Sequence, residues 1–157
     1  MEFTLKEAVH YSENNRLQEW IQRFLRESEG EMPNPNFALA DGLLLEDRHY
    51  FQPICIPLQV LKTVRVEQDI IDENELIHYR YKVDQIIQKL PQWDMPPLIA
   101  QYNGTEFVLT DGNHRYSALR KEKISGYYTI VWCNEHMKNS VYEIMVDKGW
   151  IDFGIQI

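Results

Sequence analysis

Five successive residues of this sequence carry more hydrogen-bonding and charged groups than a simple turn requires: Asp111, Gly112, Asn113, His114 and Arg115. They lie between an apolar run and a helical pattern, so we expect a turn that opens a helix. Unpaired N–H groups at a helix start attract anions, and an arginine within the first turn adds a donor fork that matches phosphate oxygens. Glycine lets the backbone turn where a Cβ would be in the way. The pattern favours a phosphate-binding loop.

The same residues also have purely structural interpretations. Asp111 alone would cap the helix, a contribution of about 1 kcal/mol, with His114 and Arg115 exposed on the surface. Alternatively, Arg115 is a buried partner for a carboxylate, in which case removing it would strand a charge. Four polar or charged side chains and one glycine exceed what a cap needs, so ligand binding is the favoured interpretation.

Predicted strands place this loop at the end of a hairpin. Residues 106–110 have the β-branched and aromatic content of a buried strand, and residues 98–102 form the strand before it. Asn103-Gly104 predicts a two-residue hairpin turn between the two strands. A further strand is predicted at 127–132, where the aromatic residues suit a half-buried surface.

The loop and its neighbours resemble the ParB/sulfiredoxin superfamily. The stretch D-G-N-H-R-Y-S-A-L-R, followed by the strand Y-Y-T-I-V-W, is similar to the signature of that superfamily, in which a G-x-x-R type loop at a helix start binds nucleotide phosphates. I-C-I-P-L-Q-V-L at 54–61 resembles the opening strand and turn of the domain, and P-P-L-I-A-Q-Y at 96–102 the strand before the motif. The resemblance implies an α+β fold: a ParB/sulfiredoxin-like mixed sheet flanked by helices, here with extra N-terminal helices and a C-terminal helix.

The resemblance also implies roles for the loop residues. Gly112 and the amides of Asn113 and His114 would cradle phosphate, Arg115 would be the charge clamp, and Asp111 would be a helix cap or a magnesium ligand. His114 would orient or stabilise a transferring phosphoryl group, so His114 and Asp111 are the candidate catalytic residues. The implied ligand is a nucleoside triphosphate or diphosphate with magnesium.

Three activities share this loop in the superfamily: sulfinic acid repair, CTP binding and hydrolysis, and phosphorylation of free serine. Sulfiredoxins place a cysteine nucleophile where this chain has Asn113, so we exclude that activity. We expect a nucleotide-phosphate-binding domain, either a phosphotransferase or an NTPase acting on a small-molecule acceptor. The alternative is a noncatalytic regulatory or nucleic-acid-associated module that uses the loop to sense a ligand. A catalytic base would come from elsewhere in the chain, and Glu46, Asp47 and Glu67 are candidates by chemical type alone.

Composition narrows the choice of partners. The chain has 157 residues, 44% of them hydrophobic, which is enough for one domain with a full core. Its net charge of -8 opposes a broad nucleic-acid-binding surface. No stretch predicts a membrane span or a signal peptide, so a cytoplasmic protein is expected. Cys55 and Cys133 lack metal-ligand spacing and are predicted to be buried, nonfunctional thiols.

The rest of the chain is predicted to surround this core within one compact domain. Residues 1–50 form an N-terminal helical extension, 51–135 the ParB/sulfiredoxin-like core, and 136–157 a C-terminal helix and tail. A capping box at Thr4 to Glu7 begins the first helix, and an apolar stripe at helical spacing predicts a second. That stripe comprises Leu17, Trp20, Ile21, Phe24 and Leu25. A long helix over 72–90 should pack on the sheet, ending before Pro91.

Overall fold

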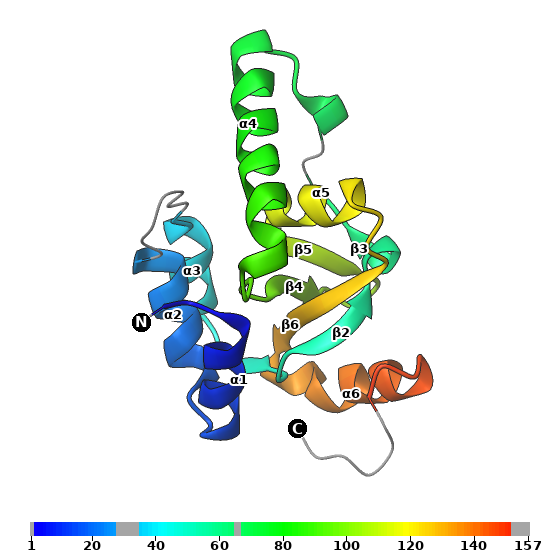
Figure 1. Ribbon diagram of the computed structural model, residues 1–157. Helices are drawn as coiled ribbons and strands as arrows, with labels where there is room; N and C mark the ends of the chain where they lie inside the picture. The colour runs from blue at the N-terminus through cyan, green and yellow to red at the C-terminus, as the bar shows by residue number, and fades with distance from the viewer. Residues whose placement is uncertain (1, 28–34, 65–66, 152–157) are drawn as a thin grey trace.

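The computed structural model describes residues 2–27, 35–64 and 67–151. The helices in these ranges are α1 (Leu5–Glu13), α2 (Leu17–Glu27), α3 (Phe37–Leu43), α4 (Glu73–Lys89), α5 (Asn113–Lys121) and α6 (Lys138–Asp147). The strands are β1 (Arg48–Tyr50), β2 (Ile54–Pro57), β3 (Leu61–Lys62), β4 (Leu98–Tyr102), β5 (Phe107–Asp111) and β6 (Gly126–Asn134). The strands form one mixed sheet with helices around it (Figure 1). The predicted fold class, α+β with a mixed sheet flanked by helices, is confirmed.

The sheet is organised around β6, its longest strand. The strand order is β1-β6-β4-β5-β3, and β2 also pairs with β6. β6 runs antiparallel to β1 and β2 and parallel to β4, while β5 is antiparallel to β4 and parallel to β3. Ile99 of β4 lies opposite Ile130 on one side and Asp111 on the other. The register therefore places the end of β5, and the loop that follows it, at the level of the middle of β6.

The two faces of the sheet are buried under different helices. Side chains alternate along β4 and β6, so Ala100 and Val131 point to one face and Ile99 and Ile130 to the other. The first face packs against buried side chains of α4, α5 and α6. The second packs against α1, α2 and α3. The N-terminal helices thus bury the part of the second face that β4 and β6 form around Ile99, Ile130 and Trp132.

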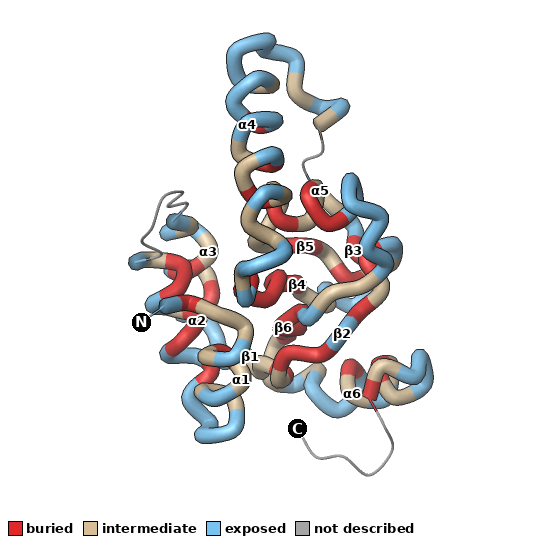
Figure 2. Tube along the Cα trace, viewed as in Figure 1, coloured by how far each residue is buried: buried red, intermediate tan, exposed pale blue. Residues whose placement is uncertain are grey.

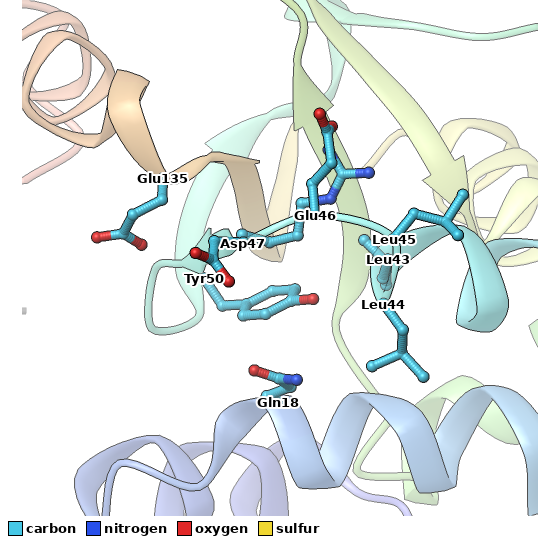
Figure 3. A pocket seen from close by; sticks show the side chains of 9 residues that line it. Gln18, Leu43, Leu44, Leu45, Glu46, Asp47, Tyr50 and Glu135 are labelled. Carbon is cyan, nitrogen blue, oxygen red and sulfur yellow. The ribbon is translucent and has the colours of Figure 1, made fainter.

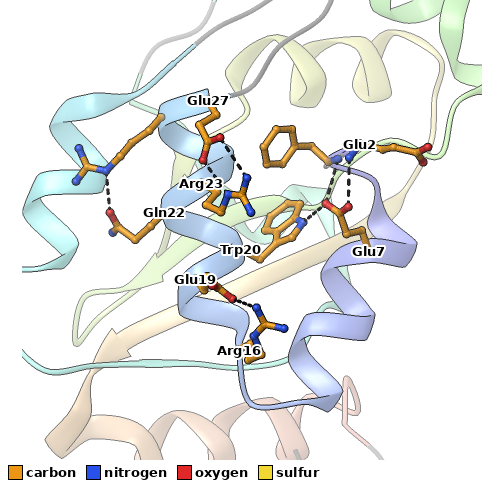
Figure 4. A network of polar contacts seen from close by, with 10 residues as sticks. Glu2, Glu7, Arg16, Glu19, Trp20, Gln22, Arg23 and Glu27 are labelled. Carbon is orange, nitrogen blue, oxygen red and sulfur yellow. Dashed lines mark hydrogen bonds and ion pairs between the residues drawn. The ribbon is translucent and has the colours of Figure 1, made fainter.

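Local signals explain why the N-terminal helices form. Thr4 Oγ1 accepts a hydrogen bond from Glu7 N at 3.1 Å, as the capping box predicts, and Glu7 also accepts one from Trp20 Nε1 at 2.8 Å. This second bond ties α1 to α2 (Figure 4). The apolar stripe predicted for the second helix is confirmed, because its five members are the buried residues of α2. The sequence after this helix, at 27–36, is polar and contains Gly30, Pro33 and Pro35, which predicts a surface linker; most of it lies outside the described residues.

Helix α4 reproduces the predicted long helix. Asp72 caps it by accepting a hydrogen bond from Glu75 N at 2.9 Å, and Pro91 follows its last residue within a short 3-10 turn. Its buried residues are Tyr79, Val83 and Ile86. The first half of the helix projects beyond the sheet and is largely exposed (Figure 2).

The hairpin between β4 and β5 has a longer loop than predicted. Tyr102 pairs with Phe107, so the connection contains four residues rather than the two of Asn103-Gly104. The Asn103 side chain accounts for the difference, because its Oδ1 accepts hydrogen bonds from the backbone N–H groups of Thr105 and Glu106, both at 3.0 Å. Gly104 still has the positive φ, 107°, that makes it suited to a turn. Among the described residues, no helix combines the length and apolarity needed to cross a bilayer.

Candidate functional site

The predicted loop joins β5 to α5, and Gly112 is its turning point. Gly112 has φ 109°, which residues with a Cβ rarely adopt. A Cβ here would lie 2.8 Å from Leu98 Cδ2 and 3.0 Å from Arg115 Nη2. Both the backbone angle and the close packing therefore require glycine, as the sequence pattern indicated.

Arg115 points from α5 into the protein interior. Its side chain is 9% exposed, and its Nη2 donates to Asp111 Oδ2 at 2.9 Å. Its Nη1 donates to the carbonyl oxygens of Pro96 and Pro97, at 2.9 and 2.6 Å. This geometry corresponds to the structural alternative for Arg115, a buried ion pair with a carboxylate. A direct contact between Arg115 and a phosphate stays a prediction, and it requires the guanidinium to release these partners.

The Asp111 carboxylate is also held on both oxygens. Oδ2 accepts from Arg115, and Oδ1 accepts from Asn36 Nδ2 at 3.1 Å. The N-cap of α5 is Gly112, which has no side chain to cap the helix. The predicted helix-cap role of Asp111 is therefore wrong, because the ion pair and Asn36 occupy its oxygens. Its role as a magnesium ligand stays a prediction.

The partners that sequence reasoning missed come from the N-terminal helices. Asn36 caps α3 by accepting from Leu39 N at 3.1 Å, while its amide nitrogen holds Asp111. The Phe24 ring of α2 lies under the Arg115 guanidinium, with Cζ 5.2 Å from the ring centroid. An asparagine before an apolar run is a recognisable helix-start signal, but nothing local connects it to an aspartate 75 positions away. The helical extension is thus attached directly to the loop.

The remaining loop residues face α4. The Asn113 side-chain oxygen is buried and makes no hydrogen bond within the described residues. The His114 ring lies 4.7 Å from the Tyr79 ring, centroid to centroid. The Tyr79 hydroxyl in turn lies 2.5 Å from Ser117 Oγ and donates to Asn113 O at 3.5 Å. The start of α5 is therefore a partly exposed group of polar side chains and backbone.

Burial dominates the electrostatics of the loop. It raises the pKa of the Asp111 carboxyl, and the Arg115 charge and the hydrogen bonds from Asn36 and Arg115 oppose that rise. Burial likewise lowers the pKa of the Arg115 guanidinium, and Asp111 opposes that fall. Two charges removed from water together are stable only as a pair, so the loss of either one would leave the other uncompensated.

The three carboxylates proposed by chemical type lie in separate places. Glu67 forms an ion pair with Arg80 of α4. Glu46 and Asp47 precede β1, in which Arg48 pairs with Asn134 at the end of β6. Asp111 pairs with Ile99 of β4, and Ile99 in turn pairs with Ile130 in the middle of β6. Glu46 and Asp47 are therefore displaced along the sheet from the loop. No group of three or more His, Cys, Asp or Glu residues in the described part of the chain is arranged to hold a metal ion.

The two cysteines differ in environment. Cys133 is fully buried in the sheet, and burial raises the pKa of its thiol to about 11. Cys55 is exposed, so the prediction that both thiols are buried is wrong for this residue. The reason is the alternation along β2, where Ile54 and Ile56 take the buried positions.

Comparisons with known proteins give matches among solved structures alone. No protein-family model matches the chain, and no curated protein matches it. Sulfiredoxin from Arabidopsis thaliana is 18% identical over 50% of this chain and 82% of that chain, with a TM-score of 0.39. The Pnob8-like ParB N-domain is 16% identical over 70% of this chain, with a TM-score of 0.40.

The match covers only 41% of the ParB chain's own length. A conserved hypothetical protein from Pyrococcus furiosus matches over 50% of this chain and 31% of its own, at 19% identity and a TM-score of 0.37. Sulfiredoxin and ParB both belong to the superfamily whose signature the loop resembles in sequence. TM-scores of this size carry no information about activity, so a function has to be inferred from the side chains.

Proposed function

We propose that the chain binds the phosphate groups of a nucleoside diphosphate or triphosphate, with magnesium, at the start of α5. The observation that supports this most strongly is that the N-cap of α5 is Gly112, which has no side chain to cap the helix. The preceding residue, Asp111, has a carboxylate, but its oxygens accept from Arg115 and Asn36 instead. The helix start is left with the partial positive charge of its N–H groups, to which an anion such as phosphate binds favourably.

Each loop residue has a role in this proposal. Gly112 allows phosphate oxygens to approach the backbone, and the amides of Asn113 and His114 donate to them. His114, beside Tyr79, orients the terminal phosphoryl group. Arg115 holds the loop from behind through Asp111 and the two proline carbonyls, which keeps the amides in a fixed direction.

The same proposal includes a reaction: the bound phosphoryl group is transferred to an acceptor or hydrolysed. Either reaction depends mainly on positioning and on charge stabilisation of the phosphoryl group, and both need a group that orients the acceptor. Magnesium would bring the missing positive charge, with Asp111 as its protein ligand if one oxygen gives up its hydrogen bond. A small-molecule hydroxyl or water would be the acceptor.

Calorimetric titration tests binding and chemistry separately. The protein is titrated with pyrophosphate and then with nucleoside triphosphates, each with and without magnesium, and phosphate release is followed in parallel. We expect pyrophosphate to bind, and His114→Ala to weaken binding about tenfold, the effect of one lost charge-assisted contact. The matched control is His78→Ala, a substitution of an exposed histidine on α4, which should leave the affinity unchanged.

Two results would count against the proposal. If neither pyrophosphate nor any nucleotide binds the folded protein, the loop is structural. If the His78→Ala control weakens binding as much as His114→Ala, the phosphate lies elsewhere. Binding without phosphate release in the presence of magnesium would limit the function to ligand sensing.

A further inference from the structure

A second candidate site lies at Gln18 of α2 and Leu43 of α3, the opposite ends of these helices from Phe24 and Asn36, which contact the loop. It is a cavity of about 400 Å³, between α2, the segment that connects α3 to β1, and the turn after β6. Its lining residues are Gln18, Leu43, Leu44, Leu45, Glu46, Asp47, Arg48, Tyr50 and Glu135. Figure 3 shows Asp47 and Glu135 on one side of the Tyr50 ring, the leucines on the other, and Gln18 of α2 across from it. A volume of this size suits a small organic molecule.

Two lining residues have buried polar atoms with no partner. Arg48 Nε and the Tyr50 hydroxyl are buried and make no hydrogen bond within the described residues. The rest of the Arg48 guanidinium is engaged: Nη2 donates to Gly42 O at 3.0 Å, and Nη1 pairs with Glu46 at 3.0 Å. Because an unmade hydrogen bond at a buried group is costly, atoms of this kind in residues that line a cavity point to a ligand that completes them after a small rearrangement of the two side chains.

The protonation state of both groups makes them donors. Burial raises the pKa of the Tyr50 hydroxyl to about 12, so it keeps its proton at neutral pH. The Arg48 Nε always carries a hydrogen. The ligand is therefore expected to present an oxygen acceptor to this part of the cavity.

The cavity wall is also divided by charge and polarity. Asp47 forms no ion pair with any described residue, whereas Glu46 is paired with Arg48 and Glu135 with Lys138. One carboxylate is thus uncompensated on the side where Asp47 and Glu135 lie. On the opposite side, Leu44 and Leu45 are 53% and 81% exposed, which leaves apolar surface for a hydrocarbon group.

We propose that this cavity binds a small molecule with a primary ammonium group, a neighbouring carbonyl oxygen and a short branched hydrocarbon chain. The ammonium pairs with Asp47, the oxygen accepts from Tyr50 and Arg48, and the hydrocarbon lies against Leu44 and Leu45. This chemistry occurs in neutral amino-acid derivatives and at the N-terminus of a peptide. A free carboxylate on the ligand is disfavoured because it would face Glu46, Asp47 and Glu135. The proposal is independent of phosphate binding at α5.

Binding is tested with probes that remove one feature at a time. The protein, labelled with ¹⁵N, is titrated with leucinamide and followed by amide chemical shifts. Three control probes are 4-methylpentanamide, which lacks the ammonium, glycinamide, which lacks the hydrocarbon, and 3-methylbutylamine, which lacks the carbonyl. We expect leucinamide to shift amides of residues 44–50 and 135, and each control probe to bind more weakly, the uncharged one by about tenfold.

Three variants identify the contacts. Asp47→Asn should weaken leucinamide about tenfold, and Tyr50→Phe roughly two- to tenfold while melting at the same or a higher temperature. Asp84→Asn, the same change at an exposed carboxylate on α4, should have no effect. A leucine-led tripeptide amide separates the two sources: tighter binding than leucinamide assigns the site to a peptide N-terminus, and weaker binding to a free derivative.

Several outcomes would overturn the proposal. They are shifts confined to other residues, equal affinity for leucinamide and the uncharged amide, equal effects of Asp47→Asn and Asp84→Asn, and the absence of any binding to a folded protein. Tyr50→Phe that lowers both stability and affinity would show the hydroxyl to be a structural group.

Discussion

Arg115 and Arg48, whose side chains are 9% and 11% exposed, have similar surroundings but differ in how many of their hydrogen-bond donors have partners. Arg115 and Arg48 each lie over an aromatic ring at 5.2 Å, pair with a carboxylate, and donate to a backbone carbonyl. Around Arg115 the carboxylate is buried as well, with Asp111 10% exposed. Around Arg48 the carboxylate is Glu46, 63% exposed, and Arg48 Nε has no hydrogen-bond partner in the described part of the chain.

The difference separates two uses of the same chemistry. A buried arginine with a buried carboxylate and two carbonyl acceptors fixes the chain, and here it joins the N-terminal helices to the loop. Arg48 Nε and the Tyr50 hydroxyl have no partner among the described residues, so both can still donate a hydrogen bond to a ligand. Hydrogen-bond completion, more than residue type or motif, distinguishes the structural arginine from the one that lines a site.

The largest expected effect comes from removing each guanidinium in turn. Arg115→Ala strands the buried Asp111 carboxylate and should lower the free energy of unfolding by about 3–5 kcal/mol. Arg48→Ala leaves Glu46 exposed to water and should cost roughly 1–3 kcal/mol, for its lost hydrogen bonds. Denaturant melts of both variants measure the two values. Equal losses would remove the distinction between the two arginines.

Two tyrosine hydroxyls sharpen the comparison at a smaller scale. Tyr79→Phe loses the contact with Ser117 and should cost about 0.5–1.5 kcal/mol. Tyr50→Phe removes a hydroxyl that has no partner among the described residues, so it should cost about 0 kcal/mol or stabilise the fold. Both substitutions keep the ring, so packing is matched. A Tyr50→Phe variant as destabilised as Tyr79→Phe would show that the Tyr50 hydroxyl is satisfied in solution.

The smallest effect is a loss of stability at alkaline pH. Cys133 lies opposite His49 of β1, and burial raises the pKa of its thiol from 9.0 to about 11. The folded chain keeps this proton where the unfolded chain has lost it, so its contribution is complete below pH 9 and falls as the pH rises to about 11. In denaturant melts at about pH 9.5, just above the pKa of the thiol in the unfolded chain, we expect a loss below about 1 kcal/mol. Cys133→Ala should flatten this part of the pH profile; an unchanged profile would assign it to other groups.

The sequence predicted well those features that neighbouring residues determine. The capping box at Thr4, the apolar stripe of α2 and the course of α4 depend on spacing within one element, and all three are confirmed. The glycine requirement at position 112 was also predictable, because the turn itself demands it. The exposure of Cys55 could have been predicted from its strand, in which buried and exposed residues alternate.

The direction of the loop side chains could not be predicted in this way. Whether Arg115 faces solvent or the interior depends on Pro96, Pro97 and Phe24, which come from other parts of the chain. The bond between Asn36 and Asp111 spans 75 positions. The burial of the Arg48 side chain was equally beyond local pattern, because its partners come from β6 and α3. Tertiary contacts, not local pattern, decide these positions.

Because α1, α2 and α3 pack on the second face of the sheet, the N-terminal helices cannot complete their packing early during synthesis. Helices α1 and α2 have 9 and 11 residues, and isolated helices of this length are marginal in water. The strand residues they bury against, Ile99, Ile130 and Trp132, leave the ribosome much later. Although domains generally fold from the N-terminus onward, the first helices of this chain must wait, with Trp20 and Phe24 uncovered, until β6 has been made. A nascent chain stalled before residue 130 would therefore present an apolar segment for a chaperone to hold.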